Sequence, residues 1–302
     1  MKSQSKAYLY ALLAIGAWST IATAFHLTLR HIGFMELLMY AGMTSTLVFA
    51  AYLAVQGKLV TAFRKPVRHL AAMALAGFLN PYLYYLLLLR AYELLPAQEA
   101  GTLNYFWPVV LVLLSIPLLG QKIGWKGILA VLVSFAGIVV ISTHGRFWEL
   151  QFSNPSGVLL ALTCPFIWAL YWILNIKIPG PDIEKLFIGF LTGTLLITLT
   201  YTLLHPWQLP SFKGLAGSVY AGIFEMGLTF ILWLKALKHS RTTAHISNLV
   251  FLSPFLSLFF IQIIVGEEIL MTTLAGLALI VAGILLQQYG DLRRHMRKTD
   301  SA

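Results

Sequence analysis

The sequence predicts an all-α membrane protein with ten transmembrane helices, arranged as two inverted repeats of five helices each. Three observations support this fold class. Of the 302 residues, 59% are hydrophobic and 11% are charged, and the mean hydropathy is +0.80, so charged side chains are too few to cover a soluble surface. The apolar residues form ten long runs separated by short breaks. Scarce residues of the first half also recur at equivalent positions of the second half.

Each apolar run is long enough for a helix that crosses a bilayer, which needs roughly 20 residues. The runs cover residues 7–28, 34–56, 69–89, 97–119, 124–142, 156–176, 184–204, 215–237, 243–265 and 271–289. Residues 7–143 form the predicted first repeat, residues 156–289 form the second, and residues 290–302 form a basic cytoplasmic tail. We reject a cleaved signal peptide, because its removal would leave nine spans and an incomplete first repeat.

The distribution of Lys and Arg predicts the orientation. If the N-terminus is cytoplasmic, 17 of the 21 Lys and Arg residues fall on the inside, and four fall outside: Arg30, Arg90, Arg146 and Lys213. Cytoplasmic loops carry such an excess of positive charge. Both termini are therefore expected in the cytoplasm.

Composition and motifs exclude several other classes of protein. The formal net charge is +10, but the basic residues lie between apolar runs and form no patch, so we expect no nucleic-acid partner. The single cysteine, Cys164, permits no intrachain disulfide and has no metal-ligand spacing. Because no phosphate-binding loop or catalytic motif is present, we expect no enzyme activity, no metal, no cofactor and no ATP-driven pump.

The internal repeat rests on Gly and Pro, which have positional meaning in helices. Shifts of 145 positions (77 to 222) and then 146 positions (108 to 254) superpose Gly77 on Gly222, Pro108 on Pro254, Gly120 on Gly266 and Gly137 on Gly283. Since each repeat has an odd number of spans, the second must insert upside down. Inverted repeats are recurrent in transporters, where the substrate binds at mid-depth between the halves.

Glu225 lies near the middle of the run 215–237 and is the residue around which we expect a site. An ionised carboxylate at this depth costs at least ~2.5–3.5 kcal/mol, so it must be protonated, paired or turned toward a wet cavity. A hydrogen bond to a neighbouring helix is the alternative. The internal shift places Asn80 opposite Glu225, and Pro81 frees a backbone carbonyl beside it.

Several aromatic residues lie deep within the runs, whereas the interfacial aromatic belt prefers the ends. They are Trp18, Tyr105, Trp107, Trp168 and Trp172, and Asn104 precedes Tyr105. Trp168 and Trp172 share a helix face. Such rings stack on a flat ligand or bind an ammonium group, although each could also serve only helix packing. Pro108 is expected to loosen the helix at this cluster.

Glu99 and His245 begin equivalent runs, and Thr102 matches Asn248, so Glu99, His245 and Asn248 are candidate gating or titratable groups. Helix capping is the alternative role. We expect His26 to be a packing residue and Glu267-Glu268 to form a solvated, structural outer turn.

With Pro254 and Gly266-Glu267 ahead of a last helix, the ten-run pattern resembles the drug/metabolite transporter superfamily and its EamA-type repeats over nearly the whole chain. Four segments resemble the bacterial aromatic amino-acid exporters: Trp18-Ser19-Thr20, Asn104-Tyr105-Phe106-Trp107-Pro108, Gly120-Gln121-Lys122 and Phe166-Ile167-Trp168-Ala169. The resemblance implies a central cavity lined by Tyr105, Trp107 and Trp168. Phe224-Glu225-Met226-Gly227 and Asn80-Pro81-Tyr82 depart from the exporter pattern.

These observations predict a secondary active transporter that moves a small organic metabolite, such as an amino acid, by alternating access. The resemblance favours export, a monomer and the bacterial cytoplasmic membrane. The expected partners are the small-molecule substrate and the lipid bilayer. The predicted substrate-binding residues are Tyr105, Trp107, Trp168, Asn80, Glu225, Asn104, Trp18 and Trp172, with Glu225 as a proton-coupling or ammonium-binding group. A translocase for lipids or lipid-linked sugars, and a non-transporting membrane sensor or scaffold, remain as alternatives.

Overall fold

The structure, a computed structural model, describes residues 4–119, 125–142, 144–145, 154–239, 249 and 252–299. In these residues the regular structure is entirely helical, which confirms the all-α prediction for the described part of the chain. Three segments, labelled η, are π-helical.

The helices in chain order are α1 (Gln4–Leu29), α2 (Phe34–Val55), α3 (Leu59–Phe63), α4 (Val67–Gly77), η1 (Phe78–Leu83), α5 (Tyr84–Leu94), α6 (Ala97–Asn104), α7 (Trp107–Leu119), α8 (Trp125–Ser142), α9 (Pro155–Lys177), α10 (Asp182–Leu204), α11 (Phe212–Ala221), η2 (Gly222–Gly227), α12 (Leu228–His239), α14 (Leu252–Phe260), η4 (Ile261–Val265) and α15 (Met271–Thr299). The predicted basic tail continues α15 as helical backbone up to Thr299.

Seven helices of the described chain are long and apolar enough to cross a membrane. They are Gln4–Leu29, Phe34–Val55, Val67–Leu94, Ala97–Leu118, Pro155–Lys177, Asp182–Leu204 and Phe212–Ala236. Three shorter apolar helices, Val131–Ile141, Leu252–Val265 and Met271–Leu286, lie within the remaining predicted runs. The chain is therefore an integral membrane protein, and the count of ten spans stays a prediction.

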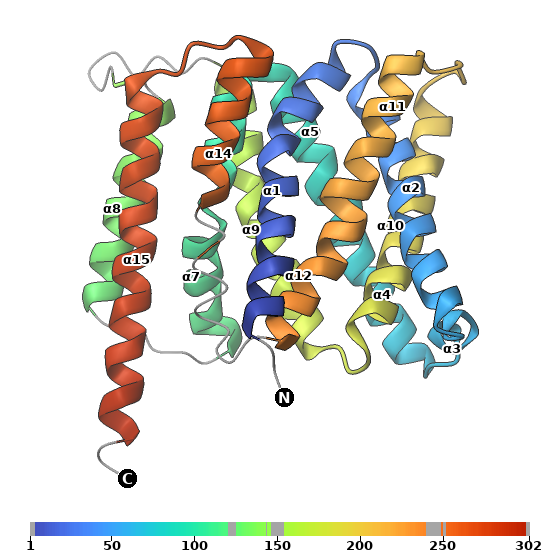
Figure 1. The fold of residues 1–302 in the computed structure, drawn as a ribbon, viewed down its shortest axis with the longest axis horizontal. Coiled ribbons are helices and arrows are strands. Elements are labelled where there is room, and N and C mark those ends of the chain that lie inside the picture. The colour runs from blue at the N-terminus through green and yellow to red at the C-terminus, as the bar shows by residue number, and fades with distance from the viewer. Residues whose placement is uncertain are drawn as a thin grey trace.

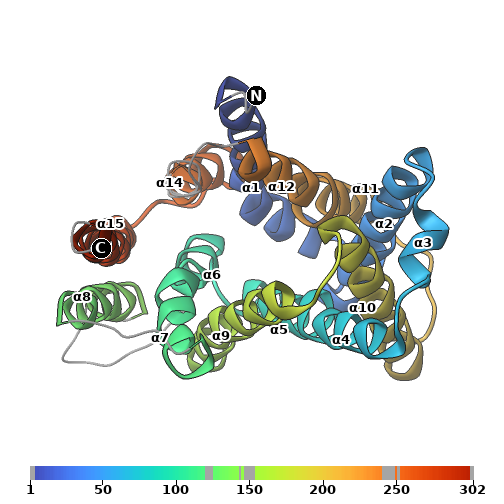
Figure 2. The same ribbon diagram turned by 90° about the horizontal axis from the view of Figure 1, so that it is seen from below.

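The helices stand side by side in two rows (Figures 1 and 2). In Figure 2, α14, α1, α12 and α11 form one row, and α7, α9, α5 and α4 form the other. The first helix of each half thus lies among helices of the other half, since α1 packs against α12 and α14, whereas α9 packs against α5 and α7. The two halves interlock and share one core.

The two ends of the rows are closed by tight packing at small residues. At one end α8 packs along α15, where a Cβ on Gly137 would lie 2.5 Å from the Gly276 carbonyl oxygen. At the other end, a Cβ on Gly77 would lie 2.1 Å from the carbonyl oxygen of Gly189 in α10. A Cβ on Gly222 would lie 2.6 Å from the Ala41 carbonyl oxygen in α2. These glycines allow backbones to approach closely.

Two long helices each contain a π-helical segment at mid-length. The first comprises α4, η1 and α5, and Asn80 in η1 has extended backbone angles (φ −148°, ψ 119°) next to Pro81. The second comprises α11, η2 and α12, and η2 contains Glu225. Figure 1 shows the two running in opposite directions, because α4 and α12 lie at the same end as the chain termini while α5 and α11 lie at the far end.

Candidate functional site

An aromatic cluster lies between the two rows, with Trp168 of α9 at its centre. The Trp168 ring lies 4.8 Å from that of Tyr84 and 6.1 Å from that of Phe230, measured between ring centroids. It also contacts Tyr171 and Trp172 of its own helix, each at 5.9 Å. The cluster therefore combines α5 of the first half with α9 and α12 of the second.

Trp18 of α1 joins this cluster through contacts with two rings of α12. Its ring lies 6.4 Å from that of Phe230 and 5.4 Å from that of Trp233. Its indole N–H donates a hydrogen bond of 3.4 Å to the backbone carbonyl of Glu225. This contact ties α1 to the π-helical segment η2.

The Glu225 carboxylate lies deep inside the bundle among tyrosine hydroxyls. The Tyr85 hydroxyl donates to its Oε1 atom at 2.9 Å. The hydroxyls of Tyr84, Tyr92 and Tyr105 also lie within electrostatic reach of Glu225. Among the described residues, the Glu225 carboxylate makes no ion pair with a basic side chain. The hydrogen-bond donor that contacts it there, the Tyr85 hydroxyl, is uncharged.

Asn104 is linked to this cluster, because its Nδ2 atom donates to the Tyr84 hydroxyl at 2.8 Å. Its Oδ1 atom is buried and has no hydrogen-bond partner within the described part of the chain. The helix breaks directly after Asn104, at Tyr105 and Phe106, which confirms the loosening predicted from Pro108. Tyr105 faces Ser253 of α14.

Trp107 and Asn80 are not joined to the aromatic cluster by any ring contact of the described residues. Trp107 begins α7, and in the described structure its ring contacts no other aromatic ring. Asn80 is fully buried, and neither polar atom of its amide makes a hydrogen bond with a described residue. The Tyr171 hydroxyl lies within its electrostatic reach. Asn80 is therefore a buried neighbour of Tyr171.

Most of the predicted substrate-binding residues, Asn80 excepted, are more exposed than the aromatic residues packed against them. Trp18, Asn104, Tyr105, Trp107, Trp168, Trp172 and Glu225 are each partly exposed. Tyr85, Tyr171 and Phe230 behind them are at most 2% exposed. Glu225 lies deep in the bundle and is nevertheless partly exposed.

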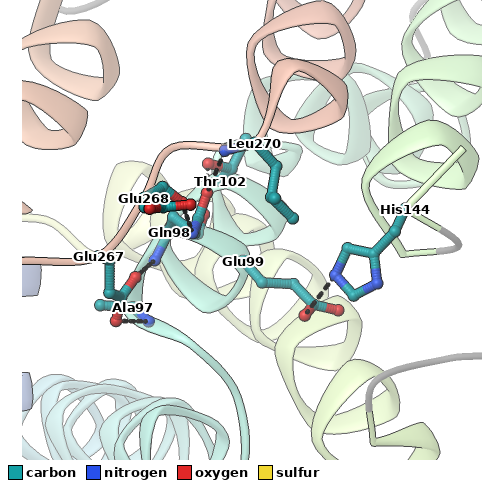
Figure 3. A network of polar contacts seen from close by, with 8 residues as sticks. All are labelled: Ala97, Gln98, Glu99, Thr102, His144, Glu267, Glu268 and Leu270. Carbon is teal, nitrogen blue, oxygen red and sulfur yellow. Dashed lines mark hydrogen bonds and ion pairs between the residues drawn. The ribbon is translucent and has the colours of Figure 1, made fainter. Parts of the chain in front are cut away.

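A second polar network connects the halves at the end of the molecule away from the chain termini (Figure 3). The Glu267 carboxylate accepts from the backbone N–H groups of Ala97 and Gln98 (3.1 and 3.4 Å) and so caps α6. Gln98 donates to the Glu268 carbonyl at 3.0 Å and accepts from the Leu270 N–H at 3.2 Å. The expectation of a solvated turn was therefore wrong for Glu267, whereas Glu268 is exposed.

Two histidines face carboxylates of this network. His26 Nδ1 lies 3.9 Å from Glu267 Oε1, and His144 Nε2 lies 3.7 Å from Glu99 Oε2. Glu99 is 2% exposed and lies in α6. The other two gating candidates, His245 and Asn248, lie outside the described residues. No group of three or more His, Cys, Asp or Glu among the described residues could hold a metal ion.

Sequence reasoning missed Tyr84, Tyr85 and Phe230 as site residues. One signal was available for two of them, because the shift that superposes Asn80 on Glu225 also superposes Tyr85 on Phe230. Both repeats therefore carry an aromatic ring five positions beyond the central polar residue.

Comparison with known proteins identifies relatives of the whole chain. Residues 5–143 and 155–287 each match the EamA-like transporter family. The aromatic amino acid exporter YddG of Ancylobacter novellus is 27% identical over 76% of this chain and 79% of its own length. A probable terminal-alkyne amino-acid exporter of Streptantibioticus cattleyicolor is 24% identical over 93% of both chains.

A solved crystal structure shares the fold. It superposes with a TM-score of 0.67 over 96% of this chain and 99% of its own, at 24% sequence identity.

Proposed function

Because the chain belongs to the EamA-like transporter family, we propose that it is a secondary active exporter of a small organic metabolite, such as an amino acid. It works by alternating access around a central cavity lined by aromatic rings. The names of the relatives support the substrate class, since two of them are called exporters of amino acids. We place the protein in the bacterial cytoplasmic membrane.

One observation supports this proposal most strongly. Glu225 and partly exposed aromatic rings meet deep inside the bundle, and they come from both stretches that match the family, residues 5–143 and 155–287. Trp18 and Tyr85 come from the first stretch, and Trp168 and Glu225 come from the second. A site built from both halves changes its access when one half rocks against the other.

The proposed architecture has ten spans in two inverted repeats, residues 7–143 and 156–289, with both termini in the cytoplasm. The two long helices with π-helical segments support it, because they run antiparallel and carry these segments at equivalent positions (Figure 1). The close approaches of Gly77 to α10 and of Gly222 to α2 are a second equivalent pair.

In this proposal the substrate lies against Trp168, Trp172, Trp18 and Tyr105, with Trp107 at the broken helix beside them. Asn104 and Glu225 supply polar contacts, and Asn80 acts through Tyr171. The network of Glu267 and Gln98 closes the outer end of the site, with Glu99 and His144 beside it. His245 and Asn248 are the proposed counterparts at the inner end.

Counterflow in proteoliposomes tests this function. Vesicles preloaded with unlabelled phenylalanine should transiently accumulate labelled phenylalanine when they contain the protein. Trp168→Ala should reduce the initial rate at least tenfold, because it removes the ring that joins the two rows. Trp207→Ala is the matched control, since Trp207 is 56% exposed and outside the cluster. Equal rates for both variants, or no counterflow of any amino acid or amine, would overturn the proposal.

A further inference from the structure

We propose that the central site selects organic amines, molecules with a flat apolar group and an ammonium group, over zwitterionic amino acids. This inference rests on the proposed transport function and narrows its substrate class. It is drawn from the charges, acceptors and rings around Glu225.

The first step is the charge of the site. The ion pairs of the described residues lie at the helix ends, for example Lys65 with Glu184 at 2.6 Å and Arg90 with Glu93 at 2.5 Å. Glu225 has no such partner in the described chain. A buried carboxylate without a counter-charge is costly, and a cationic ligand supplies the missing charge.

The second step concerns the carboxylate of an amino acid. The ammonium and carboxylate of an α-amino acid are attached to the same carbon atom. Binding the ammonium to Glu225 therefore brings a second carboxylate alongside it, and the two negative charges repel strongly in a medium of low dielectric constant. Relief would need a basic side chain, and the described residues around Glu225 supply only tyrosine hydroxyls.

The third step is the polarity of the groups left for a ligand. Asn104 Oδ1 is a buried acceptor with no partner in the described structure, and its amide nitrogen is already engaged by Tyr84. The Glu225 carboxylate also only accepts. The amide of Asn80, which could donate, belongs to a fully buried residue next to Tyr171. Asn104 Oδ1 and the Glu225 carboxylate thus both favour a ligand that donates.

The fourth step is the wall of rings. Trp168, Trp18 and Trp172 are partly exposed members of the aromatic cluster. Tyr85 contacts Tyr84 of that cluster and donates its hydroxyl to the Glu225 carboxylate. Aromatic faces attract cations, and this attraction increases when the cation is desolvated. An aromatic cluster linked to one carboxylate therefore suits an ammonium group on a flat apolar molecule.

The test uses three ligands that share a phenyl ring and differ in charge: phenethylamine, phenylalanine and 3-phenylpropionate. Each compound is added without label as a competitor, and the counterflow of labelled phenethylamine or labelled phenylalanine into proteoliposomes is measured. We expect phenethylamine to compete at least tenfold more tightly than phenylalanine, and 3-phenylpropionate to compete least. Glu225→Gln, which keeps a hydrogen-bond acceptor for Tyr85, should remove this preference. Glu268→Gln deletes the same charge from an exposed turn and should leave the preference unchanged.

The outcomes separate this inference from the proposed function. Tighter competition by phenylalanine than by phenethylamine would overturn the amine preference and leave a transporter of amino acids. A preference that persists in Glu225→Gln would overturn the role of the carboxylate. Absence of counterflow for every ligand would overturn both proposals.

Discussion

Two carboxylates from the second half meet the first half in different ways. Glu267 accepts from two backbone N–H groups, and the Gln98 amide beside it is used on both its oxygen and its nitrogen (Figure 3). Glu225 accepts from one tyrosine hydroxyl, and Asn104 nearby leaves its oxygen unpaired in the described structure. A satisfied buried network holds elements in place, whereas unpaired polar atoms beside partly exposed rings can receive a ligand.

We propose that the Glu267 network is structural and that the Glu225 cluster binds the substrate. Changes at the first should affect stability, and changes at the second should affect transport. The following predictions test that division, from the largest expected effect to the smallest.

Glu225→Gln should lower amine transport at neutral pH at least tenfold and remove its dependence on pH. In the wild type, transport should fall as pH falls, because protonation removes the negative charge that binds the ammonium group. The groups that face Glu225 are the hydroxyls of Tyr84, Tyr85, Tyr92 and Tyr105. Initial rates across a range of pH measure this effect. Parallel pH profiles for the two proteins would contradict a titrating role for Glu225.

Gln98→Ala should lower the free energy of unfolding by about 1–3 kcal/mol, because it leaves the Leu270 N–H without its partner. Thermal unfolding of the purified protein measures the change. Gln56→Ala, at an exposed position, is the control and should have no effect. The ratio of amine to amino-acid competition should stay at the wild-type value. A changed ratio would show that this network takes part in ligand selection.

Asn80→Leu should change the free energy of unfolding by less than about 1 kcal/mol, because the Asn80 amide has no hydrogen bond with a described residue to lose. Asn104→Leu is the matched comparison and should cost more, since it removes the hydrogen bond to Tyr84. Equal losses in the two variants would show that the Asn80 amide is satisfied in the membrane.

The sequence predicted the helices well where apolar runs determine them. The predicted run 156–176 is α9, Pro155–Lys177, and Pro108 predicted the break after Asn104. Of the predicted site residues, the structure brings Trp18, Trp168, Trp172, Asn104 and Glu225 into one connected cluster.

Other features depended on contacts between distant parts of the chain. Glu267 follows a Gly in a short polar turn, and local sequence indicates a solvated residue there. It caps a helix whose first residue lies 170 positions earlier, so no local pattern could reveal the contact. Tyr85 also reaches Glu225 across 140 positions, and only its equivalence with Phe230 pointed to it.

The most direct test of the central claim is whether water and substrate reach Trp168. Cys164 is the only cysteine of the chain and is fully buried, so Cys164→Ala gives a cysteine-free background. In that background, Trp168→Cys should react with a water-soluble methanethiosulfonate reagent, and phenethylamine should slow the reaction. Phe166→Cys, on the exposed face of the same helix, should show no such protection. A Trp168→Cys thiol that stays unreactive, or reacts at the same rate with and without ligand, would contradict a central substrate site.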